Sequence, residues 1–354
     1  MPTPMRRWLQ VFYHNLGLGG ETKRPSRYSS PTNPRAFCIG GGAAIQSRQL
    51  AAISLLSQRL LRRSIASHWT KPASIYPTYS KPFFTKSGAN AGIYVYHKEL
   101  SNGGTVATIV VSNPAKLNSV GSALLDEIAM ACKSLCNDEM LRAVVLTGGP
   151  TVPGKAPSFV GGANIAEMNS FATASQAREF ITRVHTANQA IRDIPVPVLA
   201  RIHGFVLGAG LELMTSCDLR IATAKSVFGM PEVKVGVPSI VEAALLPGII
   251  GMGRTRRLLY LAENISANEA ETWGLVEKVV DDEAALDDAV NEWVGRIAEM
   301  GPQAIRRQKW IMKRWENCTV DEGIKLGIET FAMSYLDGGK EPHQYMGKFL
   351  DRKR

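Results

Sequence analysis

From residue 91 onward the chain alternates short apolar runs with segments of helical periodicity, and this alternation is what most limits its fold. Thr105–Val111, Arg142–Leu146 and Val196–His203 are short apolar runs of the length expected for buried strands. Gly121–Leu135 and Ser175–Arg192 lie between them and place apolar residues on one helical face. Because strands that alternate with helices usually pair in parallel, the sequence predicts an α/β fold.

A predicted hairpin opens this part of the chain, and predicted helices close it. Tyr94–His97 and Thr105–Val111 flank Asn102-Gly-Gly104, a combination typical of a hairpin. Ser175 is in a position to cap the helix that follows it. Further helices are expected at Arg254–Ala262, Asn268–Trp273, Ala284–Glu299, Pro302–Trp315 and Val320–Tyr335. We therefore divide the chain into a leader (1–90), a core (91–283) and a C-terminal helical region (284–354).

Charge distinguishes the leader from the rest of the chain. Residues 1–90 carry 13 of the 41 basic residues and one acid, whereas residues 91–354 hold 28 basic and 30 acidic residues, a net charge of −2. The overall charge of +10 therefore gives no support for nucleic-acid binding by the body. An Arg-rich, Ser-rich, acid-poor leader with an amphipathic stretch is typical of an organelle transit peptide. We expect a disordered leader that directs the protein to the mitochondrion. The alternative is a tail without a targeting role, on a peroxisomal or cytoplasmic protein.

Composition also limits the class of protein. No apolar run approaches the roughly 18 residues of a spanning helix, so we expect no membrane partner. Five cysteines without metal-ligand spacing do not form a disulfide framework. Cys132 and Cys136 are expected to be free thiols rather than a metal pair. The C-terminus, Asp351-Arg-Lys-Arg354, is not a Ser-Lys-Leu address for peroxisomes.

Two glycine-rich segments could present backbone N–H groups to a ligand. Ser158–Asn164 contains Gly-Gly-Ala, which lets a ligand approach the backbone, although an ordinary tight turn would look the same. His203–Glu212 places Gly-Ala-Gly at a helix start, where free N–H groups could hold an oxyanion. No Gly-x-x-x-x-Gly-Lys-Ser/Thr pattern is present, which excludes a P-loop. His203 itself is expected to be a structural residue at a strand end.

Two carboxylates accompany these segments. Glu212 lies on the predicted helix among Leu211, Leu213 and Met214, and Glu232 lies in a loop bounded by Gly and Pro. Each could be a plain surface acid. Together with the backbone donors they would suit acid–base chemistry beside a carbonyl group, provided that the fold brings them together.

At these residues the sequence resembles the crotonase family, the enoyl-CoA hydratases and isomerases. Five segments match motifs of that family in the same order. The resemblance covers about residues 91–354 and leaves the leader unexplained. The segments are Asn113–Asn118, Ser158–Met168, His203–Ala222, Phe228–Gly236 and Ile265–Val276.

The resemblance implies a crotonase-like fold of repeated ββα units and an acyl-CoA thioester as the substrate. The N–H groups of Ala163 and Ala209 would hold the thioester oxygen and stabilise its enolate. Glu212 and Glu232 would act as acid and base, hydrating a 2-enoyl-CoA to a 3-hydroxyacyl-CoA, running the reverse reaction, or shifting the double bond. The implied substrate contacts are Val160, Gly161, Gly162, Ala163, Asn164 and Lys116, with Lys348 and Arg352 as lesser candidates.

The resemblance also implies partners. Coenzyme A would be part of the substrate, no metal or redox cofactor would be needed, and the protein would form a homotrimer or hexamer. Two alternatives remain: a protein that binds CoA thioesters without turnover, and an RNA-binding relative. The helix that would bind RNA, Gly121–Asn137, carries one lysine, Lys133, beside Asp126 and Glu127. One cation is too few for a nucleic-acid surface, so no nucleic-acid partner is expected.

The sequence departs from the family at several positions. Asn164 replaces an Asp, and Ala166 replaces a Lys that could contact CoA phosphates. Val237–Pro247 replaces a Pro-Gly-Ala-Gly-Gly turn, which leaves the acyl group and the choice of reaction open. Glu242, in this segment, is expected to be a surface acid, and a third carboxylate near the pocket is the alternative.

Overall fold

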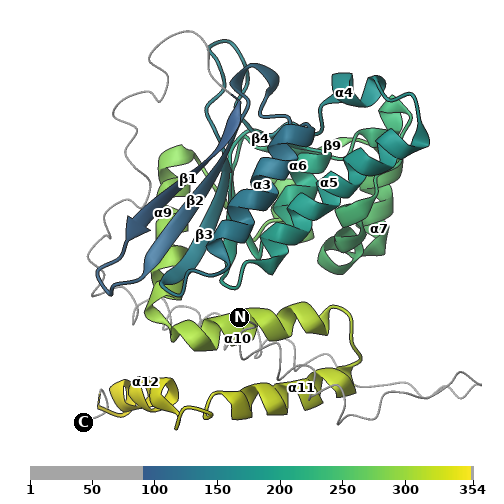
Figure 1. Ribbon diagram of the computed structural model, residues 1–354. Helices are drawn as coiled ribbons and strands as arrows, with labels where there is room; N and C mark the ends of the chain where they lie inside the picture. Colours follow the sequence, from purple (N-terminus) through teal and green to yellow (C-terminus); the bar gives the residue numbers. More distant parts are fainter. Residues whose placement is uncertain (1–90, 352–354) are drawn as a thin grey trace, which may run out of the picture. The chain divides into compact units, whose positions relative to one another are not determined.

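The computed structural model describes residues 91–351, and these form a two-sheet α/β body with helices around it (Figure 1). The leader and its predicted targeting segment, as well as Arg352, lie outside the described residues. The larger sheet consists of β1 (Gly92–Glu99), β2 (Thr105–Ser112), β3 (Leu141–Gly148), β5 (Val198–Ile202), β7 (Leu219–Thr223) and β10 (Lys278–Val280). The smaller sheet consists of β4 (Ser158–Val160), β6 (Phe205–Leu207), β8 (Val227–Gly229) and β9 (Asn264–Ser266).

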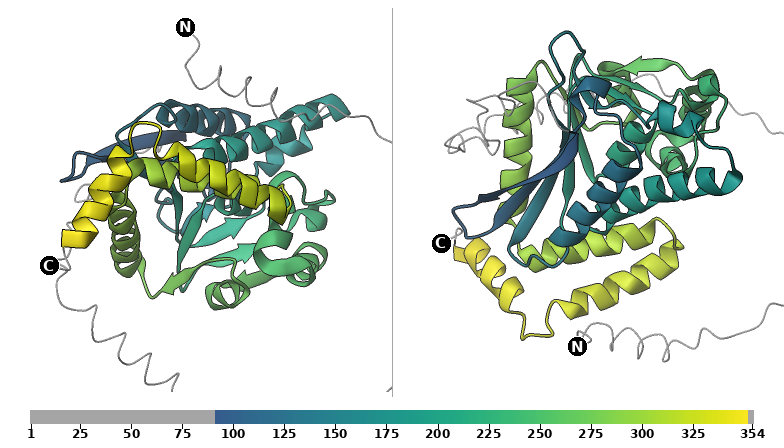
Figure 2. Two further views of the ribbon diagram at one scale, coloured as in Figure 1. Left: turned by 90° about the horizontal axis from the view of Figure 1, so that it is seen from below. Right: turned by 45° about the horizontal axis from the view of Figure 1, so that its top comes forward.

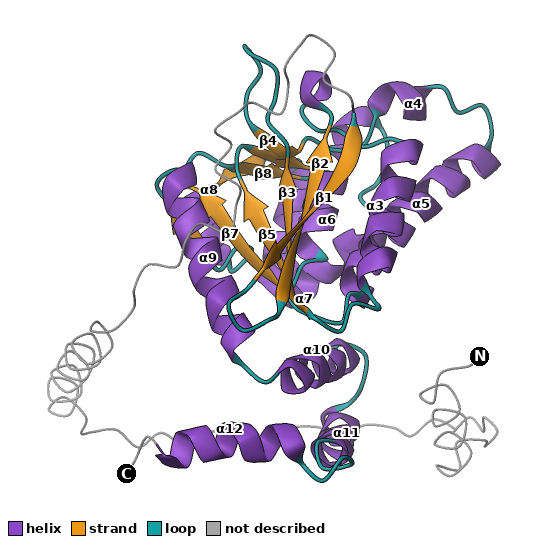
Figure 3. Cartoon of the chain, turned by 60° about the vertical axis from the view of Figure 1, so that its left-hand side comes forward, coloured by secondary structure: helices purple, strands orange, loops and turns teal. Residues whose placement is uncertain are grey.

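The larger sheet runs in the order β1-β2-β3-β5-β7-β10, and both of its faces are covered. β1 and β2 form the predicted antiparallel hairpin, and every later neighbouring pair in this sheet is parallel. Alternate residues face opposite sides. Val106 and Val145 pack under α9 (Glu283–Glu299), whereas Ile109 and Leu146 face the core beneath α3 (Ser122–Leu135) and α5 (Ala174–Asp193). Figure 3 shows these helices on the two sides of the sheet. The α/β prediction is confirmed.

The smaller sheet positions the site. β4, β6 and β8 are parallel neighbours, and β9 pairs antiparallel with β8. The carboxyl ends of β4, β6 and β8 therefore lie at one edge, the usual place for a ligand in α/β proteins. Gly161–Asn164, Gly208–Glu212 and Met230–Glu232 follow these three ends directly. Segments that are distant in the sequence thus meet at one edge.

Each predicted helix is present, although several ends differ, and two further helices, Ile165–Asn169 and Lys340–Asp351, were not predicted. α5 is capped by Thr173, not by Ser175, because Thr173 and Gln176 form a reciprocal capping box. The helix predicted from Arg254 begins earlier, at Leu246, with a kink at Gly251. The remaining helices are α4 (Ile165–Asn169), α6 (Ala209–Thr215), α7 (Leu246–Leu261), α8 (Ala267–Trp273), α10 (Pro302–Trp315), α11 (Val320–Met333) and α12 (Lys340–Asp351), with short 3-10 turns η1 (Pro114–Lys116), η2 (Glu232–Val235) and η3 (Val241–Leu245).

Polar contacts attach the C-terminal helices to the core. The buried Lys309 ammonium of α10 donates to the Val196 carbonyl at 2.9 Å and lies 2.6 Å from the Asp218 carboxylate. Arg306 donates to the carbonyls of Asp138 and Leu141. Figure 2 shows α11 and α12 continuing from α10 outside the sheets. Within residues 91–351, no helix has the length and apolar character needed to cross a membrane.

Gly210 makes the contact between α6 and β4 possible, and its replacement should unfold this junction. A Cβ at Gly210 would clash with the backbone carbonyl of Val160. Gly210→Ala should therefore lower the free energy of unfolding by about 3 kcal/mol or more, measured by urea denaturation. Gly295→Ala on α9 is the matched control, because a Cβ there meets no atom within 4 Å. Equal stability of the two variants would contradict this packing.

Candidate active site

The Ala163 N–H lies in a loop whose conformation is fixed by hydrogen bonds of the neighbouring backbone groups. β4 ends at Val160, and the Gly161 N–H donates to the Leu117 carbonyl at 2.8 Å. The Val120 N–H donates to Gly162, and the Asn164 N–H donates to Val120. In such a parallel bridge the residues on either side of Ala163 make both bonds, so the Ala163 N–H points to the opposite side. It is available to a ligand there.

The Ala209 N–H is the second predicted donor. Ala209 is the first residue of α6, where an N–H group has no acceptor within the helix. Gly208 precedes it with a positive φ of +51°, which suits glycine. Because glycine has no side chain, none caps the helix at this position. The helix start therefore presents its N–H groups and its positive dipole end to a ligand.

The two donor loops and Glu232 converge. A Cβ placed on Gly208 would lie 2.5 Å from Glu232 Oε1 and 4.0 Å from the Cα of Gly162. The Glu232 carboxylate thus lies against the turn before Ala209, and the turn before Ala163 is close to the same point. Glu232 is half-buried at the start of η2, and its Oε2 accepts a hydrogen bond from the Ser239 hydroxyl at 2.8 Å.

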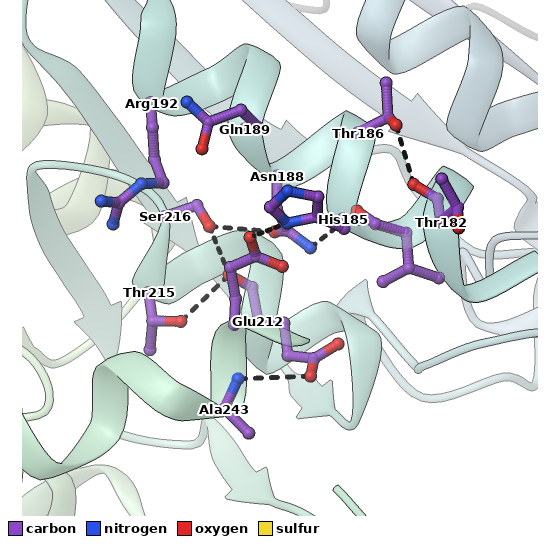
Figure 4. Close-up of polar contacts among 12 residues, drawn as sticks. Thr182, His185, Thr186, Asn188, Gln189, Arg192, Glu212, Thr215, Ser216 and Ala243 are labelled. Atoms are coloured by element: carbon purple, nitrogen blue, oxygen red, sulfur yellow. Dashed lines mark hydrogen bonds and ion pairs between the residues drawn. The ribbon is translucent and has the colours of Figure 1, made fainter. Parts of the chain in front are cut away.

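Glu212 lies one helical turn beyond Ala209 and is buried, with 5% of its surface exposed. Its Oε1 accepts a long hydrogen bond of 3.4 Å from the Ala243 N–H (Figure 4). Burial raises the pKa of Glu212 to about 8, with further contributions from the nearby negative charges of Glu232 and Glu242. Glu212 therefore keeps its proton at neutral pH, and interpretation as a surface acid is excluded.

Glu242 is not the surface acid that the sequence analysis expected. Its side chain is 6% exposed, and its Oε1 lies 2.7 Å from Nδ1 of His185 on α5. Burial raises the pKa of Glu242, and the hydrogen bond from His185 lowers it. The prediction was wrong because apolar neighbours in the sequence, such as Val241 and Ala243, gave no sign that α5 supplies a partner from 57 positions away.

The other predicted residues have varied surroundings. Asn164 caps α4 by accepting from the Glu167 N–H, so the amide takes over the capping role that an Asp would have there. Lys116 is exposed at the end of η1. The Lys348 ammonium lies over the Tyr345 ring, 4.7 Å from its centroid. His203 is buried beside Arg201, and burial lowers the pKa of His203 to about 4, consistent with a structural role.

Asn118, at the end of the first matching segment, holds together the backbone segments next to the site. Its backbone is left-handed, with φ +55°, and its side-chain amide donates to the carbonyls of Gly149 and Ser158 at 2.7 and 2.8 Å. These bonds connect the turn after β2 to the start of β4. The chain needs Asn here because its side chain is short, polar and tolerant of this conformation.

The cysteines of the described residues are free thiols, and no group of side chains there is arranged to bind a metal ion. Cys132 and Cys217 are buried free thiols, and burial raises the pKa of Cys132 to about 12. The part of the chain from residue 91 to residue 351 contains no cluster of three or more His, Cys, Asp or Glu side chains arranged for a metal ion.

Three contacts of the site were missed from the sequence. Ser239, Ala243 and His185 touch the carboxylates, yet Ser239 and Ala243 lie in a segment with no helical or strand period. His185 lies on a helix that the sequence does predict, but its partner depends on how that helix packs. The signal that could have been used is weak: a Ser and an acid within ten positions of Glu232.

Comparison with known proteins identifies the family of this chain. Residues 101–336 match the protein family described as enoyl-CoA hydratase/isomerase. The chain is 31% identical over 256 residues to the short-chain-enoyl-CoA hydratase of Clostridium acetobutylicum, covering 72% of this chain and 95% of that protein. It is 32% identical over 250 residues to the crotonyl-CoA hydratase of Syntrophomonas wolfei, covering 70% and 93%. The crystal structure of an enoyl-CoA hydratase from Mycobacterium smegmatis superposes with a TM-score of 0.66 at 27% identity, covering 73% of this chain and 96% of that one. This chain therefore belongs to the enoyl-CoA hydratase/isomerase family.

Proposed function

We propose that the protein adds water to the double bond of a 2-enoyl-CoA, giving a 3-hydroxyacyl-CoA, and that it catalyses the reverse reaction. The observation that carries the proposal is the meeting of Glu212, Glu232 and the two donor loops at one edge of the smaller sheet. Hydration of a conjugated thioester needs one acid, one base and a site for the negative charge of the enolate. The relatives named as enoyl-CoA hydratases support the same reaction.

The thioester oxygen would accept hydrogen bonds from the N–H groups of Ala163 and Ala209. Negative charge builds up on that oxygen when water attacks the β-carbon. Fixed donors stabilise this charge without reorganisation, and one such donor is worth roughly 2.7–4 kcal/mol in other enzymes. The substrate contacts at Val160, Gly161, Gly162 and Asn164 would be made by the same loop.

One carboxylate would take a proton from the attacking water, and the other would give a proton to the substrate. Glu212 carries the proton in the free site, which leaves the Glu232 carboxylate to accept a proton as the water oxygen bonds to the β-carbon. Glu212 then delivers its proton to the α-carbon, and the double bond becomes a single bond. After product release the proton returns from Glu232 to Glu212 through solvent. The chemistry uses no metal or redox group.

A panel of CoA thioesters tests the proposal. The full chain should hydrate short 2-enoyl-CoA substrates, with loss of the conjugated absorbance and a gain of one water by mass, and a metal chelator should not reduce the rate. A 3-enoyl-CoA that becomes a 2-enoyl-CoA without a mass gain would move the main activity to isomerisation. Tight binding of every thioester without turnover would overturn the proposal in favour of a binding protein.

We also propose that the protein is a homo-oligomer, a trimer or hexamer. Val320, Ile324, Ile328 and Phe331 repeat along α11 at helical spacing and are 79%, 58%, 64% and 66% exposed. An apolar stripe of this kind usually marks an association surface. Burial of the stripe against a second copy would shield it from water.

Ile328→Glu should therefore dissociate the protein. A buried charge in the interface is unfavourable by several kcal/mol, so light scattering after gel filtration should give a monomer for the variant and a trimer or hexamer for the parent. Glu329→Gln on the same helix is the control and should keep the parent's mass, because it adds no charge to the stripe. A parent protein that is monomeric would contradict the proposal.

The leader suggests a mitochondrial location, which we propose on composition. Residues 1–90 carry 13 basic residues and one acid. Such a segment is attracted by a membrane potential that is negative inside. A fluorescent protein fused behind residues 1–90 should enter mitochondria. Diffuse cytosolic or punctate peroxisomal fluorescence would contradict this location.

A further inference from the structure

Glu242 is a buried carboxylate with a partner at one oxygen, and it lies near Glu212. Oε1 contacts Nδ1 of His185, whose side chain is 53% exposed, whereas Oε2 forms no hydrogen bond with residues 91–351, and the backbone N–H of Glu242 itself contributes to lowering the pKa of this carboxyl. An ionised carboxylate can only accept, so Nδ1 carries the hydrogen when Glu242 is charged. A buried, incompletely paired carboxylate is unfavourable for stability. A role in the function of the protein would explain why this unfavourable burial is kept.

The residue before Glu242 is strained. Val241 has φ +44°, in the left-handed region that a β-branched side chain rarely adopts and that costs of the order of 1–3 kcal/mol. This conformation opens η3 and directs the Ala243 N–H toward both the Ile240 carbonyl, at 3.0 Å, and Glu212 Oε1, at 3.4 Å. The contact between Glu242 and His185 connects η3 to α5 directly beside the strained residue.

The charges around this position come from a few elements. η3 packs against α5, α6 and α7. Leu246–Gly253, the part of α7 that follows η3, contains no charged side chain. The charged and titratable groups that act on Glu212 and Glu242 are Glu232 of η2 together with His185 and Arg192 of α5.

We propose that Glu242 is a positioning residue for Glu212: held by His185, it keeps the strained η3 turn against the Glu212 carboxyl and places a negative charge beside it, so that Glu212 enters the reaction as an acid. The inference rests on the proposed role of Glu212 as proton donor. Its geometric elements are the buried pair, the strain at Val241 and the hydrogen bond from Ala243, which holds the Glu212 carboxyl in place but by itself lowers the pKa of Glu212. A negative charge near a carboxyl group favours the protonated form, the state that the α-carbon requires.

Glu242→Gln tests the charge. The variant keeps the shape and an acceptor for His185, so the turn should survive. Without the negative neighbour, Glu212 should lose its proton at lower pH. The alkaline limb of kcat/KM for 2-butenoyl-CoA should move down by roughly half a pH unit, and kcat at pH 8 should fall about two- to threefold, with KM changed less than about twofold. Glu263→Gln, a half-buried acid paired with Arg257, is the control and should leave the profile unchanged.

Two substitutions at His185 test the positioning. His185→Leu removes the donor and should lower kcat about tenfold, whereas His185→Asn keeps an N–H close to the position of Nδ1 and should restore most of the activity. If His185 served only in packing, the activity of the Asn variant would not exceed that of the Leu variant. Equal activity of His185→Leu and the parent would overturn the positioning role.

An infrared titration decides the question without turnover. The band of the protonated Glu212 carboxyl, identified by its loss in Glu212→Gln, should disappear at lower pH in Glu242→Gln than in the parent. An unchanged midpoint, together with an unchanged alkaline limb, would overturn the inference. A parent that shows this band but turns over no enoyl-CoA would refute the proposed function and leave the influence of Glu242 on Glu212 intact.

Discussion

Glu232→Gln is expected to lower kcat for 2-enoyl-CoA hydration about a thousandfold, with little change in KM. Glu232 Oε1 lies against the turn that precedes the Ala209 donor, so its carboxylate would lie beside the reacting carbons of a thioester held by that donor. A positioned acid or base contributes about 10²–10⁴ to the rate. Gln has the same shape and can still accept from the Ser239 hydroxyl, but it cannot take a proton from water.

Steady-state kinetics with 2-butenoyl-CoA measure this effect, and thermal unfolding of both proteins checks that the variant is folded. Glu299→Gln, an exposed acid at the end of α9, is the control and should behave as the parent. A Glu232→Gln variant that keeps more than about a tenth of the parent's kcat would show that another group accepts the proton.

Glu212→Gln is expected to abolish activity to a similar degree and, at alkaline pH, to stabilise the fold. Burial and two nearby carboxylates raise the pKa of Glu212 to about 8. Between its ordinary pKa and about 8 the folded chain retains a proton that the unfolded chain releases, so rising pH destabilises the parent across this window. Gln does not ionise, and the variant lacks this loss.

Urea unfolding at pH 5 and at pH 8.5 measures the difference. The two proteins should be close in stability at pH 5, and the variant should be more stable by about 2–4 kcal/mol at pH 8.5. Active sites commonly trade stability for function in this way. A variant that is less stable than the parent at both pH values would contradict the placement of Glu212 in a buried, acidic site.

The parts of the fold that follow from local pattern could be predicted from the sequence. The hairpin of β1 and β2 has a turn signal between two β-rich runs, and α3 has a clear apolar face. The smaller sheet was not predicted, because β4, β6, β8 and β9 contain three residues each, too few to show a period of two. The parallel pairing of these short strands comes from packing between distant segments.

The site shows the same division. Glycines and small residues marked both donor loops, because a close approach to the backbone excludes side chains, as at Gly208. Glu212 and Glu232 were predicted from segments that match family motifs, and the structure brings them near each other. The burial of Glu242 could not be predicted, since it depends on where α5 places His185 and on the left-handed turn at Val241. No local pattern encodes either of these features.

The most direct test of the account is to supply 2-butenoyl-CoA to the full chain in water enriched in heavy oxygen and to determine where the label is bound. The account predicts a 3-hydroxybutanoyl-CoA with the heavy oxygen on the β-carbon, formed by the parent and by Glu299→Gln but not by Glu212→Gln or Glu232→Gln. A folded parent that returns the thioester unlabelled, or with its double bond moved and no oxygen added, would contradict it.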